Sequence, residues 1–93
     1  MLTDKYFNKW NSFFKLRKYQ EAIKNYDVAI KCNPYSAEAY NSKGIALYEL
    51  GRQQEAMESC NMAIKYDSDN VCAYQLANEL AKKLKKSNLR IIN

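Results

Sequence analysis

The feature that most constrains the fold of this chain is an internal repeat of 34 residues. Shifting the sequence on itself by that distance aligns residues 3–36 with residues 37–70, and nine of the 34 pairs are identical. Unrelated segments of ordinary composition share about two. The identical pairs are Tyr6/Tyr40, Lys9/Lys43, Leu16/Leu50, Gln20/Gln54, Glu21/Glu55, Ala22/Ala56, Ala29/Ala63, Ile30/Ile64 and Lys31/Lys65. We therefore interpret the chain as two copies of one small unit, followed from residue 71 by a partial third.

Each unit has the apolar spacing of two helices. In the second unit, Ser36 can cap a helix that runs to about residue 50, and Gly51 can close that helix in a left-handed conformation. A second helix is expected at about residues 53–66. The same register predicts helices at about residues 4–16 and 19–32 in the first unit.

The remaining residues complete an all-α domain of five helices. Pro34 ends the second helix, because the residue before a proline avoids helical backbone. A fifth helix is expected at residues 71–86 as a cap on the stack, and residues 87–93 are expected to form a flexible tail. The predicted organisation is a single domain over residues 1–86, with repeats at 3–36 and 37–70.

Small residues occupy matched places in the two repeats. They are Ala22, Ala29, Ala56 and Ala63 on the second helices and Gly44 on a first helix. We expect two helix backbones to approach closely at each of them, because a larger side chain would push the pair apart.

Composition excludes several classes of protein. Two glycines and one proline are too few for the frequent turns of an all-β fold, and no apolar run approaches the roughly 18–20 residues of a membrane span. Histidine is absent, which removes imidazole bases and histidine metal sites. The sequence also lacks a glycine-rich phosphate loop and a paired nucleophile and base. We therefore expect no enzyme activity, no cofactor and no metal site.

The three cysteines indicate a reducing environment. Cys32, Cys60 and Cys72 are an odd number, form no Cys-x-x-Cys pair and follow no secretory signal. Reduced thiols of this kind are typical of a cytoplasmic protein. We expect Cys32 and Cys60 to be small buried apolar side chains.

The 34-residue period and these side chains closely resemble the tetratricopeptide repeat. The first repeat supplies Tyr6, Phe13, Tyr19, Glu21, Ala22, Ile23, Tyr26, Ala29, Ile30 and Pro34, and the second supplies Tyr40, Gly44, Leu47, Tyr48, Gly51, Glu55, Ala56, Ala63 and Asp67. The first repeat departs from the family pattern at Trp10 and Arg17, where the family has glycines, so its helices are expected to pack more loosely. The resemblance implies a right-handed α-solenoid of antiparallel helix pairs.

The resemblance also implies what such a fold does. Its concave groove, lined mostly by first helices, binds a segment of another protein, as in an adaptor or scaffold. The implied groove positions are Phe7, Asn11, Phe14, Asn41, Ile45, Tyr48 and Gln75. The amide side chains carry both a donor and an acceptor and can pair with any peptide backbone, while the aromatic and aliphatic ones offer apolar contact. For Phe7, Phe14 and Tyr48, packing between neighbouring helices is the alternative role.

One subtype of the family grips the C-terminal carboxylate of chaperones with lysine, arginine and asparagine side chains. The matching positions here are Phe7, Asn11, Ser42, Cys72 and Leu76, and Asn11 alone fits. Without cations at these positions a carboxylate would be poorly compensated. We therefore predict against a chaperone C-terminal motif as the ligand.

The net charge of +5 is unevenly distributed. Residues 1–36 carry +4, residues 37–70 carry −3 and residues 71–93 carry +4. The lysine run at residues 82–86 supports a second hypothesis, electrostatic binding to RNA or an anionic membrane, although a solubilising helix end with cations favoured by the helix dipole is the simpler interpretation. A third hypothesis is self-association into a homo-oligomer, because two repeats are fewer than the three that usually stabilise such a stack.

Overall fold

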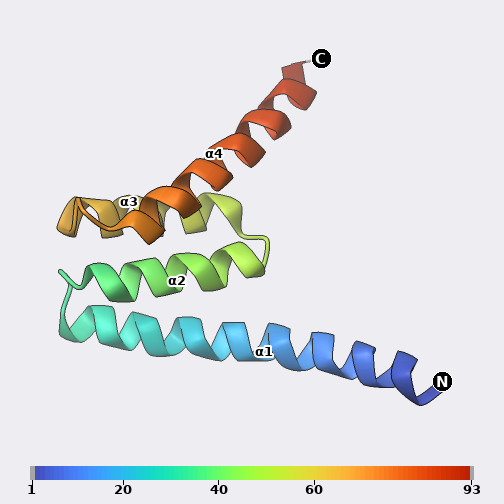
Figure 1. Cartoon of the computed structure of the whole chain (residues 1–93). Helices are drawn as coiled ribbons and strands as arrows, with labels where there is room; N and C mark the ends of the chain where they lie inside the picture. Colours follow the sequence, from blue (N-terminus) through green and yellow to red (C-terminus); the bar gives the residue numbers. More distant parts are fainter. Residues whose placement is uncertain (1, 93) are drawn as a thin grey trace.

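The computed structural model describes the backbone of residues 2–92 and the side chains of residues 15–85. Its elements are the helices α1 (Leu2–Cys32), α2 (Ala37–Glu49), α3 (Gln53–Tyr66) and α4 (Val71–Ile92), with no strand over this range. Figure 1 shows α2 and α3 as an antiparallel hairpin, with α1 beside α2 and α4 crossing on the other side. The all-α prediction is therefore confirmed. Over the described residues, none of the helices combines the length and the apolar character that crossing a membrane requires.

The turns repeat as closely as the sequence does. The Ser36 hydroxyl accepts a hydrogen bond from the amide three residues later at 3.3 Å, and the Asn70 side chain, 34 residues on, accepts the equivalent bond at 3.0 Å. Before these caps, the Asn33 and Asp67 side chains each accept a bond from the amide two residues later, at 3.2 and 3.1 Å. These bonds satisfy amides that lack a partner within a helix, and they place the repeat boundaries where the 34-residue register predicts them.

The first repeat differs from the second because it does not form a hairpin. The register predicts helices at residues 4–16 and 19–32, but α1 is one helix from Leu2 to Cys32, so residues 2–92 form four helices rather than five. The second repeat turns at Gly51, whose φ is +80°. The matched residue in α1 is Arg17, a good helix former. Its guanidinium bonds the Glu21 carboxylate one turn further on at 3.2 Å, across the expected break.

The last helix is longer than the apolar pattern indicates. A capping helix is expected at residues 71–86, and α4 continues to Ile92. Figure 1 shows its C-terminal part extending beyond the α2–α3 hairpin. The division of the chain into a domain over residues 1–86 and a tail stays a prediction.

The core lies between α2, α3 and α4. Its largest fully buried side chains come one from each helix: Leu47, Cys60 and Leu80. Ala56 and Ala63 are also fully buried, and a Cβ built at Gly44 would meet the Cys60 sulfur at 3.2 Å and the Ala56 carbonyl oxygen at 3.4 Å. The predicted close approach of α2 to α3 is therefore confirmed at Gly44 and Ala56.

The cysteine predictions have different outcomes. Cys60 is fully buried as expected, and burial raises the pKa of its thiol to about 11. Cys32 is exposed, so the prediction that it is buried is wrong. It lies at the end of α1, which packs against α2 alone among the described elements and leaves its other faces uncovered.

Candidate protein-binding surface

Three of the predicted groove residues lie on one face of α2. Asn41, Ile45 and Tyr48 are spaced by four and three residues, which places them one above another on a helix. Ile45 is 44% exposed. Asn41 is half-buried, and its amide oxygen is buried with no hydrogen-bond partner among the described residues. Because buried acceptors are usually paired, this oxygen is an unsatisfied acceptor directly beneath the face that carries the exposed Ile45.

Tyr48, at the end of this face, contacts α4. The Lys83 ammonium donates a hydrogen bond to the Tyr48 hydroxyl at 2.6 Å and lies 4.3 Å from the centre of its ring. The second contact is a cation–π interaction. Tyr48 therefore takes part in the packing of α4 on α2 and remains only half-buried.

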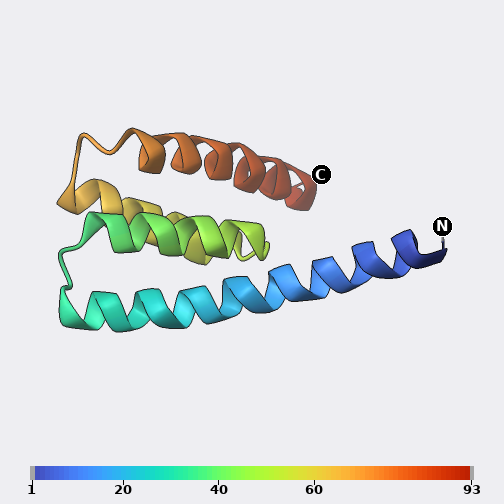
Figure 2. The same ribbon diagram turned by 60° about the horizontal axis from the view of Figure 1, so that its bottom comes forward.

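The other predicted groove residues belong to α1 and α4. Gln75 is exposed on α4. The side chains of Phe7, Asn11 and Phe14 lie outside the described range. Their backbone belongs to the N-terminal half of α1, and Figures 1 and 2 show this end of the helix running past the end of α2. It does not fold back against α2 as the first helix of a hairpin would.

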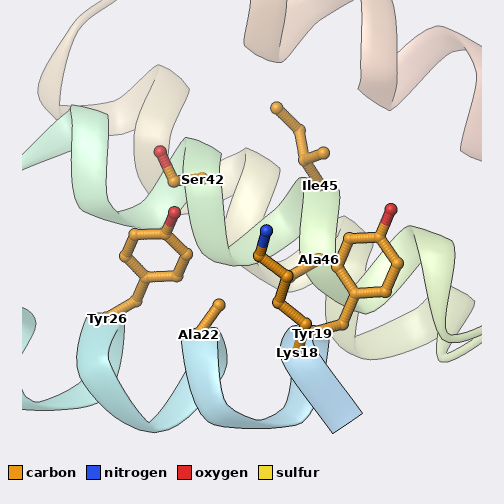
Figure 3. Close-up of a pocket in the computed structure, with 7 residues that line it drawn as sticks. All are labelled: Lys18, Tyr19, Ala22, Tyr26, Ser42, Ile45 and Ala46. Atoms are coloured by element: carbon orange, nitrogen blue, oxygen red, sulfur yellow. The ribbon is translucent and has the colours of Figure 1, made fainter. Parts of the chain in front are cut away.

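A mostly apolar groove lies between α1 and α2. One part has a volume of about 230 Å³ and is lined by Lys18, Tyr19, Ala22 and Tyr26 of α1 and by Ser42, Ile45 and Ala46 of α2. A second part, of about 240 Å³, shares Tyr26 and Ser42 with the first. Figure 3 shows the tyrosine and lysine side chains of α1 reaching toward α2, with Ser42 opposite Tyr26. The two helices are also joined by an ion pair between Lys43 and Asp27 at 2.6 Å.

Sequence reasoning did not identify Tyr19 and Tyr26 as the α1 wall of this groove. It expected a close helix contact at Ala22 and Ala29. The expectation is wrong at Ala29, which is exposed, whereas Ala22 is half-buried and lines the groove. The sequence feature that indicated this difference is Arg17, which stands where the second repeat has its turn glycine. Without a turn at this position, residues 3–16 do not fold back over Ala22 and Ala29.

The positions matched to the carboxylate clamp carry no cation where their side chains are described. Ser42 lines the groove, Cys72 is exposed and Leu76 packs against the core. Within the described residues, no three histidine, cysteine, aspartate or glutamate side chains are grouped so that they could hold a metal ion.

The C-terminal lysines have separate local contacts. The Lys83 ammonium lies against Tyr48, and the Lys82 ammonium is 3.9 Å from the Glu79 carboxylate. Lys85 is exposed, and the side chain of Lys86 lies outside the described range. These contacts give the RNA or anionic-membrane hypothesis no specific support.

Two models of a known family match the chain. A model described as TPR repeat matches residues 11–51, and one described as tetratricopeptide repeat matches residues 37–70. The second match has the bounds of the repeat deduced from the 34-residue register. The chain belongs to the tetratricopeptide repeat family. The matches of this tetratricopeptide chain overlap on α2 and together span residues 11–70, nearly two thirds of its length.

Plant proteins share short stretches with this tetratricopeptide chain. Hsp70-Hsp90 organizing protein 3 of Arabidopsis thaliana is 51% identical over 35 residues, which are 38% of this chain and 6% of that protein. Hsp70-Hsp90 organizing protein 1 is 50% identical in Arabidopsis thaliana and 48% in Glycine max, each over 42 residues, which are 45% of this chain and 7% of the relative. The chain therefore corresponds to a small part of each of these relatives.

Proposed function

We propose that this chain is a non-enzymatic module that binds a peptide segment of another protein along the concave face of a right-handed helical solenoid. The residues proposed to contact the peptide are Phe7, Asn11, Phe14, Asn41, Ile45, Tyr48 and Gln75. Membership of the tetratricopeptide family supports protein binding as the class of function.

The unpartnered amide oxygen of Asn41 is the observation that carries this proposal. A buried acceptor without a donor costs about 1–3 kcal/mol. If the Asn41 amide turns outward when a peptide binds, a backbone N–H of the peptide would supply the missing donor. The same side chain also has an N–H₂ group that can donate to a peptide carbonyl. Ile45, one turn along and exposed, would bury its side chain against the peptide.

The first experiment compares Asn41→Ala with Asn61→Ala, a matched change at an exposed position of α3. Peptides selected from a random displayed library on the full chain serve as probes, and isothermal titration calorimetry measures their affinity. We expect Asn41→Ala to weaken binding about 5–13-fold, because the lost hydrogen bonds are worth about 1–1.5 kcal/mol. The control should bind like the wild type. Equal affinity of Asn41→Ala and the wild type, or no selected peptide, would contradict the proposal.

The chemistry of the surface also restricts the kind of peptide. The named relatives are organizing proteins of Hsp70 and Hsp90, but the clamp positions Ser42, Cys72 and Leu76 offer no cation to a terminal carboxylate. We predict that the selected peptides bind equally well with a free or an amidated C-terminus. A strong loss of affinity on amidation would show that a carboxylate is recognised after all.

A further inference from the structure

The two repeats leave the same positions in different environments. On α3, three small side chains are fully buried: Ala56, Cys60 and Ala63. The matched positions on α1 are Ala22, Tyr26 and Ala29, and these line the open groove instead. The groove is therefore the place that the first helix occupies in a complete helix pair.

The chain contains a segment with the sequence of such a first helix. Residues 3–16 align with residues 37–50, the stretch that contains α2. The segment has three lysines and one aspartate, a net charge of +2, whereas residues 37–70 carry −3. Of the two walls of the groove, residues 37–50 carry −1 and residues 17–32 carry +2, so the charge of the segment is opposite in sign to that of the α2 wall alone.

The largest difference between the two stretches fits the size of the groove. Gly44 in α2 faces Ala56 and Cys60, and its counterpart in the segment is Trp10. A Cβ at Gly44 would already lie 3.2 Å from the Cys60 sulfur, so a side chain larger than a methyl group would displace its neighbours. The groove at Ala22, in contrast, is open by about 230 Å³, which gives a large aromatic side chain space to enter.

The segment of the same chain is directed away from this groove. Folding it back would require a break in α1 and a turn at Arg17, where the second repeat has Gly51 at φ +80°. Residues with a Cβ avoid that left-handed conformation. The ion pair between Arg17 and Glu21 also spans the site of the break.

We propose that residues 3–16 of a second copy fill the groove, and that the two copies exchange these segments in a domain-swapped dimer. Gly44 faces Ala56 and Cys60, so by the 34-residue shift position 10 would face positions 22 and 26. The midpoint between positions 10 and 22 is residue 16, and the midpoint between positions 10 and 26 is residue 18. Two antiparallel α1 helices are thus related by a two-fold axis close to Arg17, and one interface fills both grooves.

The exchange has a consequence for the peptide-binding face. Phe7, Asn11 and Phe14 of the second copy would lie beside α2, on which Asn41 and Ile45 are found. This consequence rests on the proposed function, whereas the dimer itself does not depend on it.

Analytical ultracentrifugation of the full chain over a concentration series tests the dimer. We expect a monomer–dimer equilibrium in the wild type. Ala22→Arg puts a charged side chain into the groove and should lower the association constant by more than about tenfold. Gln20→Arg makes the same kind of change on the opposite, exposed face of α1 and should leave the association constant unaltered. Arg17→Gly restores the turn residue of the second repeat and should shift the equilibrium toward monomer.

The single tryptophan gives a second readout, because Trp10 belongs to the exchanged segment. Its emission should move to shorter wavelength as the concentration rises through the dimer range, and this shift should be absent in Ala22→Arg. A chain that is monomeric at every concentration, or a dimer that Ala22→Arg leaves intact, would overturn the proposal. If thermal melts show that Ala22→Arg fails to fold, Arg17→Gly decides the question. Peptide binding by a monomeric chain would refute the swap and leave the proposed function standing.

Discussion

Among single residues, Cys60 shows most directly how packing controls reactivity. It is fully buried, whereas Cys32 and Cys72 are exposed. We predict that a thiol reagent such as DTNB modifies two cysteines rapidly in the folded protein and the third only as fast as the protein opens. Cys60→Ala should remove the slow phase and leave the fast one. Three equal rates in the wild type would contradict the burial of Cys60.

The same thiol makes stability depend on alkaline pH. Burial raises the pKa of Cys60 from 9.0 to about 11. As the pH rises through this interval, the unfolded chain releases a proton that the folded chain retains, so the free energy of unfolding should fall. Urea denaturation at about pH 8 and about pH 10.5 measures this fall. It should be smaller in Cys60→Ala, and equal falls in the two proteins would refute the assignment.

At the scale of elements, Arg17 and Gly51 occupy the same position in the two repeats and can each be replaced by alanine. Gly51→Ala should cost about 1–2 kcal/mol, because a Cβ is unfavourable at a φ of +80° even though nothing lies within 4 Å of it. Arg17→Ala should change stability by less than about 0.5 kcal/mol, since it keeps a good helix former and loses one exposed ion pair. Denaturant midpoints check both values. A cost for Arg17→Ala as large as that for Gly51→Ala would contradict the placement of Arg17 on an exposed helical surface.

The same comparison explains which elements could be predicted from the sequence. The α2–α3 hairpin was predictable because local signals agree with the repeat, with Ser36 as a cap and Gly51 in the turn. The 34-residue register gives a wrong prediction at Arg17, because it places a turn in a stretch that contains no glycine or proline. Local helix propensity there outweighs the symmetry of the repeat, and α1 continues through the predicted break.

At the scale of the whole molecule, the open first repeat gives the chain an extended outline. Its radius of gyration is 15.6 Å, whereas a compact chain of this length has about 12 Å. Figure 2 shows why, since α1 extends well past the α2–α3 hairpin toward its N-terminus. Such a shape leaves the groove between α1 and α2 accessible.

The candidate protein-binding surface could be predicted only in part, because some of its contacts depend on how the helices are arranged relative to one another. Helical spacing is enough to align Asn41, Ile45 and Tyr48 on α2. The contact of Lys83 with Tyr48 depends on how α4 crosses α2, and no local pattern encodes that crossing. The exposure of Tyr26 depends on whether residues 3–16 cover it, which is decided by tertiary arrangement rather than by periodicity.

Backbone NMR across residues 15–20 and 49–54 tests the open first repeat most directly, because these stretches are matched by the 34-residue shift. We predict helical Cα shifts and slow amide exchange without interruption over residues 15–20. Between α2 and α3 we predict a loss of helical Cα shifts at residues 51 and 52, followed by fast exchange at residues 53 and 54, because the first amides of a helix lack a partner within it. A matching break at residues 16–18 would contradict a continuous α1. It would mean that the first repeat closes on itself and covers Ala22 and Tyr26.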